Sequence, residues 1–108
     1  MTSMPDLAAL RQRLETGFDS IATEIAGEKA SSMGHHGRMV EKAMAALKAH
    51  DAAPDAAVDR QALLKAAARE VWAYFVTRES CGLRDHREVI RFYGIPGEVL
   101  ARLGAVER

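Results

Sequence analysis

Two adjacent histidines are the first side chains in the sequence that could carry chemistry. His35 and His36 have a glycine on either side, and Glu28 and Glu41 are the nearest acidic residues. Imidazole nitrogens bind zinc, nickel or copper, and glycines allow a short loop to fold around an ion. A closed zinc site needs about four ligands, and no cysteine or histidine at helical spacing accompanies the pair. We therefore interpret the pair as part of a solvated loop and predict no cofactor, with metal binding as a minor alternative.

Three arginines, Arg87, Arg91 and Arg102, could instead contact DNA. They lie in a stretch that is typical of a helix, a turn at Gly94 and a second helix opened by Pro96. Apolar residues occupy the positions that a helix-turn-helix unit buries, and these are Val89, Tyr93, Ile95, Leu100 and Leu103. The C-terminal segment thus resembles a generic helix-turn-helix unit.

The distribution of charge argues against DNA recognition by this unit. The chain has 15 Lys and Arg and 15 Asp and Glu, so its formal net charge is zero. Proteins that bind DNA usually carry a basic surplus, because counterion release supplies much of their affinity. On the exposed face of the second helix only Arg102 suits a guanine edge, and Glu98 would repel phosphate. We favour a structural corner in which both short helices pack on the core.

The single cysteine, Cys81, gives little support to the hypothesis that the protein is an enzyme. It stands near the end of a predicted helix, where the helix dipole opposes thiolate formation. Because it is the only cysteine, the chain cannot form an internal disulfide, which is typical of proteins in a reducing compartment. No catalytic triad spacing, carboxylate pair or phosphate-binding glycine loop occurs, so we predict that the protein is not an enzyme. The charged residues around Cys81 predict a corner held by ion pairs, with an anion pocket as the alternative: Arg78, Glu79, Arg84, Asp85 and Arg87.

The elements that must position these residues are helices, because Ala, Glu, Arg, Leu and Lys dominate the chain. We predict helices from near Pro5 to about residue 30 and at about 38–50, with a loop at 31–37 between them. A third helix should run from near Asp55 to Ser80 or Cys81 and end at Gly82, before the short C-terminal pair. The predicted fold is all-α, a small bundle of three longer helices closed by a short helix-turn-helix-like pair. It forms a single domain over residues 1–108.

Six consecutive apolar residues at 71–76 predict that the third helix is the central one. A helix that is apolar all round must be covered on all sides. We therefore expect the earlier helices on one side and the C-terminal pair on the other, closing over Trp72 and Phe75.

The first predicted helix carries an apolar stripe with steps of three and four residues. Packing within the chain is one interpretation of this stripe, which consists of Leu7, Leu10, Leu14, Phe18, Ile21 and Ile25. A helix of this length can also extend beyond a small core and pack against a second copy. We predict a homodimer, with Leu10, Leu14, Phe18 and Ile21 at the interface.

The segment from Val71 to Asp85, together with residues 93–96, resembles a small bacterial all-helical family of unknown function. The resemblance covers about residues 71–104. It implies a cytoplasmic helical domain without an assigned activity, and it transfers no catalytic or ligand-binding residue to this chain.

These observations predict a non-catalytic structural or protein-interaction domain that forms a homodimer and could have a further, unidentified protein partner. The N-terminal residues lack the pattern of a signal peptide, and no apolar run is long enough to span a membrane. We therefore expect a cytoplasmic protein without membrane contact. A DNA-binding regulator is the alternative, and metal binding at His35 and His36 is the third hypothesis.

Overall fold

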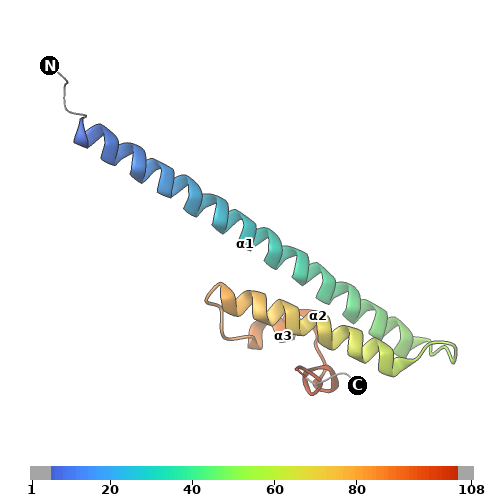
Figure 1. Ribbon diagram of the computed structural model, residues 1–108. Helices are drawn as coiled ribbons and strands as arrows, with labels where there is room; N and C mark the ends of the chain where they lie inside the picture. The colour runs from blue at the N-terminus through green and yellow to red at the C-terminus, as the bar shows by residue number, and fades with distance from the viewer. Residues whose placement is uncertain (1–5, 105–108) are drawn as a thin grey trace. The chain divides into compact units, whose positions relative to one another are not determined.

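The computed structural model describes residues 6–104, and every regular element in that range is a helix (Figure 1). The all-α prediction is therefore confirmed. In chain order the four helices are α1 (Leu7–Ala52), α2 (Arg60–Ser80), α3 (Arg87–Tyr93) and α4 (Gly97–Leu100).

Contacts along the chain divide it into two units, residues 1–31 and 32–108. All the buried residues within the described range 6–104 belong to the second unit. In the first unit, every described residue from Asp6 to Ser31 is exposed. The Asp6 carboxylate accepts a hydrogen bond from the backbone N–H of Ala8 at 3.0 Å, which caps the start of α1. The predicted start at Pro5 lies outside the described residues, and the single domain over 1–108 stays a prediction.

The loop predicted at residues 31–37 is wrong, because α1 continues through it (Figure 1). Serine and glycine are poor helix formers, and their cluster suggested a break. Side chains within the cluster and just after it are anchored, since Met33 packs against the core and Val40 is fully buried. The packing of one helix face contributes more to its stability than local propensity does, so the helix persists through the weak residues.

Helix α2 begins five residues later than the predicted start at Asp55. Residues 55–58 form a turn, in which the Val58 N–H donates to the Asp55 carbonyl at 3.0 Å. The Asp59 side chain then caps the helix by accepting a hydrogen bond from the Gln61 N–H at 3.0 Å. The predicted end is confirmed, because Cys81 is the C-cap and Gly82 follows with a φ of 86°, a left-handed conformation that favours glycine.

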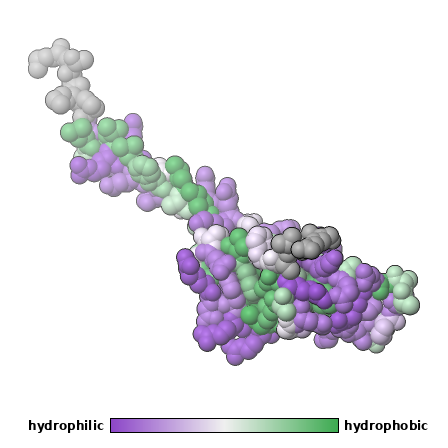
Figure 2. Space-filling model, turned by 60° about the horizontal axis from the view of Figure 1, so that its bottom comes forward, coloured by the Kyte–Doolittle hydropathy of each residue, from purple (hydrophilic) through white to green (hydrophobic). Residues whose placement is uncertain are grey.

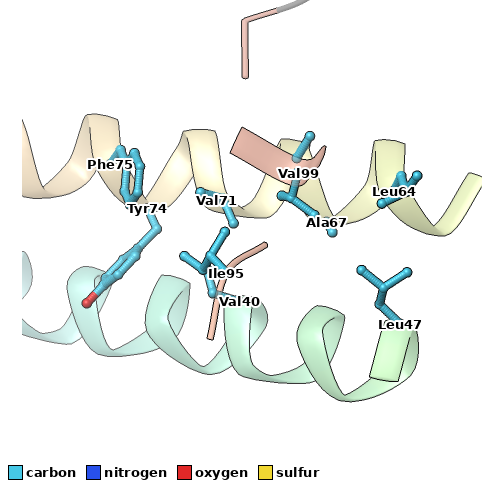
Figure 3. Close-up of a cluster of buried hydrophobic side chains, with 10 residues drawn as sticks. Val40, Leu47, Leu64, Ala67, Val71, Tyr74, Phe75, Ile95 and Val99 are labelled. Atoms are coloured by element: carbon cyan, nitrogen blue, oxygen red, sulfur yellow. The ribbon is translucent and has the colours of Figure 1, made fainter. Parts of the chain in front are cut away.

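The core lies between the second half of α1, the inner face of α2 and the C-terminal corner. Figure 3 shows side chains of α1 and α2 pointing toward one another, with residues of the C-terminal corner beside them. The corner contributes the positions predicted to be inward, since Ile95 is buried and the other four predicted positions pack partly buried against the core. The buried set comprises Val40, Leu47, Leu64, Ala67, Ala68, Val71, Tyr74, Phe75, Ile95 and Val99.

The prediction that the core covers Trp72 is wrong. Its neighbours Val71 and Phe75 are buried, but Trp72 is 51% exposed and Val76 is 42% exposed. Within the apolar run, burial therefore follows the helical period and not the run as a whole. The covering elements lie over a limited arc of α2, and Trp72 and Val76 fall outside it.

A glycine in α1 allows the C-terminal corner to approach this helix closely. A Cβ atom built on Gly37 would lie 2.7 Å from the Tyr93 hydroxyl oxygen and 3.7 Å from Cε1 of Tyr74. The two tyrosine rings meet edge to face, with centroids 5.7 Å apart. Burial, and secondarily the hydrogen bond with Tyr74, raises the pKa of the Tyr93 phenol. Gly37 thus leaves space for the partly buried Tyr93 phenol where α1, α2 and α3 meet.

We predict that Gly37→Ala destabilises the wild-type protein and that the same substitution stabilises the Tyr93→Phe variant. Alanine in a helix gains about 1 kcal/mol over glycine, whereas forcing an extra methyl into a packed site costs about 1–3 kcal/mol. With the tyrosine hydroxyl present we expect a net loss of about 1 kcal/mol in the free energy of unfolding, and in the Tyr93→Phe background a net gain. Urea unfolding of the four variants in this cycle measures both effects.

Gly34→Ala is the matched control, because the nearest atom to its Cβ is the flexible end of Arg38 at 3.4 Å. This control should stabilise the helix in both backgrounds. If Gly37→Ala had the same effect with and without the Tyr93→Phe substitution, the hydroxyl would not be the obstacle.

Candidate functional site

The apolar stripe of the first unit is the largest set of exposed hydrophobic side chains in the described chain. Its members are between 45% and 68% exposed, the extremes being Leu10 and Phe18. Figure 2 shows hydrophobic side chains following one another along the segment next to the N-terminus. The structure thus places Leu10, Leu14, Phe18 and Ile21, the predicted interface residues, on the surface of one helix. Their burial in a dimer stays a prediction.

The stripe repeats with a period of eleven residues. Leu7 and Phe18, Leu10 and Ile21, and Leu14 and Ile25 are each eleven positions apart. Eleven residues make three turns at 3.67 residues per turn, close to the 3.6 of a straight helix. The stripe therefore runs nearly parallel to the helix axis, and a partner helix can follow it without the strong left-handed supercoil that a seven-residue repeat imposes.

The histidine pair lies within α1 and not in the predicted loop. His35 is exposed and His36 is half-buried, and their rings meet edge to face at a centroid distance of 5.4 Å. Adjacent residues on a helix do not share a face. Across residues 6–104, no cluster of three or more His, Cys, Asp or Glu side chains is placed to hold a metal ion. The helix also removes the flexible glycine loop on which the metal hypothesis depended.

The three arginines of the DNA hypothesis are not presented together by a recognition helix. Helix α4 has four residues, and its Val99 is fully buried against the core. Arg102 follows α4 and donates from Nη2 to the Gln61 side-chain oxygen at 2.5 Å. Arg87 pairs with Asp85 at 2.7 Å, and Arg91 is exposed. DNA binding stays a prediction, and the geometry favours the structural corner.

The corner between α2 and α3 is held by hydrogen bonds and ring stacking. Arg78 donates from Nε to His86 Nδ1 at 3.2 Å and from Nη2 to the Asp85 carbonyl at 3.0 Å. The His86 ring stacks on Phe75 with a centroid distance of 4.0 Å and an interplanar angle of 4°. Cys81 is half-buried beside this corner. Of the predicted ion pairs, Arg87 with Asp85 forms at 2.7 Å. Arg78, which we expected to form an ion pair, donates to His86 and to a backbone carbonyl.

A second polar cluster, centred on Arg60, links three elements and was not predicted. The Arg60 guanidinium donates to both Asp51 oxygens, at 2.7 and 3.0 Å, and to both Glu98 oxygens, at 2.6 and 3.0 Å. Asp51 lies near the end of α1, and Glu98 lies in α4. Sequence spacing gives no signal for this cluster, because Arg60 and Glu98 are 38 residues apart. Glu98 is exposed, as expected, and its carboxylate pairs with Arg60, which helps to fix α4.

Comparison with known families shows which family the chain belongs to. A model described as a family of unknown function (DUF6665) matches residues 3–108. The chain belongs to this family. The predicted resemblance to an uncharacterised helical family is thereby confirmed, and the match extends over nearly the whole sequence. Searches of curated proteins and of solved structures found no match.

Membership of the DUF6665 family assigns no substrate or partner, so a function has to be inferred from the surface of the protein. No helix within residues 6–104 combines the length and the apolar character that a membrane span requires. The stripe is the longest series of exposed large apolar side chains in the described range. The others are Val58, Trp72, Val76, Leu83 and Phe92.

We predict that the Arg60 cluster stabilises the fold most strongly near neutral pH. The Arg60 guanidinium lowers the pKa of both Asp51 and Glu98. A carboxyl whose folded-state pKa is depressed contributes stability above its unfolded pKa, and this contribution is lost as the pH falls through the folded value. Arg60→Met should therefore reduce the free energy of unfolding at about pH 7 and have progressively less effect toward about pH 3.

Urea unfolding of both proteins across this range measures the effect. Lys65→Met, which removes a charge from an exposed position of α2 outside the cluster, serves as the control. Parallel pH profiles for the wild type and Arg60→Met would contradict the prediction.

Proposed function

We propose that this protein is a non-catalytic interaction domain that self-associates through the stripe of its N-terminal helical segment. The observation that carries the proposal is the exposure of all six large apolar side chains on one face of residues 7–25. Soluble proteins rarely leave an apolar face of this extent uncovered unless it meets a partner. A second copy of the chain supplies an identical stripe of the same length and period.

The apolar burial that the stripe offers is comparable in free energy to the cost of association. Full burial of a Leu, Ile or Phe side chain is worth about 1.5–3 kcal/mol, and about half of each side chain remains to be buried here. Twelve half-exposed side chains in a dimer then supply on the order of 10 kcal/mol. Association costs roughly 4–15 kcal/mol in lost freedom. The gain falls within the range of the cost, so any association through the stripe is expected to be weak and reversible.

Association also explains how the segment maintains a helix. Residues 7–31 include Gly17 and Gly27, each of which weakens a helix by about 1 kcal/mol relative to alanine. No Cβ built on either glycine would meet another atom within 4 Å. In proteins most helical stability comes from packing of the apolar face. A partner helix on the stripe provides such packing.

The proposal predicts that Leu14→Glu combined with Phe18→Glu converts a dimer into a folded monomer. Charges placed at the centre of an apolar interface must lose their hydration, so the dissociation constant should rise at least about tenfold. Sedimentation equilibrium measures the mass, which should be twice the 11.8 kDa of one chain for the wild type. The near-ultraviolet circular dichroism of the aromatic residues confirms that the bundle remains intact.

Thr16→Glu combined with Thr23→Glu is the matched control. It adds the same charge to the same segment, on the side of the helix opposite the stripe, and should leave the dimer unchanged. A wild-type protein that is monomeric at all accessible concentrations would overturn the proposal. A Leu14→Glu/Phe18→Glu variant that remains a dimer would overturn the assignment of the stripe.

A further inference from the structure

The His86 ring lies between two side chains of opposite charge, and each of its nitrogens is next to one of them. Nδ1 accepts a hydrogen bond from Nε of Arg78 at 3.2 Å. Nε2 lies 3.6 Å from Oε1 of Glu79, which is longer than a hydrogen bond. Nε2 is shielded from solvent and has no hydrogen-bond partner among residues 6–104. One nitrogen of the ring therefore has its partner, whereas the other has a carboxylate close by.

The hydrogen bond from Arg78 defines the protonation state of the ring. A guanidinium is always charged and can only donate, so Nδ1 must be without a proton. The ring is then neutral and carries its hydrogen on Nε2. Protonation would place a second N–H group against that of Arg78, and the hydrogen bond could not form. Histidine is the side chain that ordinarily changes its charge between about pH 5 and pH 8. A moderate fall in pH therefore breaks this contact.

The charged groups next to the ring act on its protonated form in opposite directions. Arg78 repels a positive ring and Glu79 attracts it, at the similar distances of 3.2 and 3.6 Å. The flanking residues Asp85 and Arg87 pair with one another at 2.7 Å. The start of α3 weakly repels a cation at this position, and the stacked aromatic ring of α2 weakly attracts one. A protonated ring is therefore not expelled from the corner, but it has to release Arg78 and approach Glu79.

We infer that His86 is a pH-sensitive switch that exchanges Arg78 for Glu79 as its partner when it is protonated. In the neutral state, Arg78 holds the segment after α2 through His86 Nδ1 and the Asp85 carbonyl. In the protonated state the first of these two bonds is lost. The ring also stacks on Phe75, so its movement changes the cover of a core residue. Helix α3 begins at the next residue and is then held less firmly against α2. The switch lies in the second unit and is independent of the stripe.

Side-chain ¹⁵N–¹H NMR of the full chain between about pH 8 and pH 5 tests the switch. At the upper end the ring should carry its hydrogen on Nε2, and Nε–H of Arg78 should exchange slowly with water. The protection of Arg78 is measured relative to Arg91, an exposed arginine of α3. At the lower end it should be about fivefold to tenfold smaller, the equivalent of one hydrogen bond. A hydrogen on Nδ1 at the upper end, a ring that stays neutral throughout, or constant relative protection would overturn the inference.

His86→Asn provides Arg78 with an acceptor that does not titrate. The side-chain oxygen of asparagine can take the place of Nδ1, so the relative protection of Arg78 should not change with pH. A fall as large as in the wild type would show that another group is responsible, which would overturn the inference. His50→Asn is the matched control, because the His50 side chain is 12% exposed and that of His86 is 14% exposed. This control should keep the wild-type profile.

Glu79→Gln removes the carboxylate that receives the protonated ring and keeps the size of the side chain. The protonated ring then faces the charge of Arg78 alone, so the loss of protection should begin at a lower pH than in the wild type. Glu70→Gln removes the same charge about two and a half turns earlier in α2 and should follow the wild-type profile. Identical profiles for Glu79→Gln and the wild type would overturn the exchange of partners.

Discussion

The fold depends on the packing of one face of α2, because the other elements of the second unit are held by it. Val71 and Leu64 lie on this face and have almost no exposed surface. The second half of α1 and the C-terminal corner both pack their apolar residues against it (Figure 3). Helices α3 and α4 have seven and four residues, too few to be stable alone. Burial against α2 is what keeps these short helices folded.

Polar interactions then fix how the segments join around this face. Arg60 connects the end of α1 to α4, and Arg78 holds the segment after α2 in place through its hydrogen bond to His86. These groups lie at the edge of the core, where exposed or half-exposed ion pairs contribute little individually. Their importance is geometric, since each holds a turn in place while the apolar residues pack. The charged residues of the C-terminal segment are therefore mainly explained by the fold itself.

The N-terminal segment has the opposite character. Its polar residues are solvated and its apolar residues are exposed. An amphipathic helix normally buries its apolar face, and the described chain provides nothing that buries this one. A second copy of the chain would bury the stripe against an identical one. Such a protein would act through association, because two paired N-terminal segments would join two copies of the second unit. That interpretation is consistent with a family to which no function is assigned.

The sequence by itself determined the all-α class, the C-terminal end of α2, the turn at Gly94 and the inward positions of the C-terminal corner. These features depend on local rules, namely the helical period and the preference of glycine for left-handed conformations, as at Gly82 and Gly94. The tertiary structure decided the continuity of α1, the exposure of Trp72 and the cluster around Arg60. Each of these depends on which distant segment lies against a given face. Gly37 illustrates the difference: its local preference indicated a break, whereas its lack of a side chain is used for the approach of Tyr93.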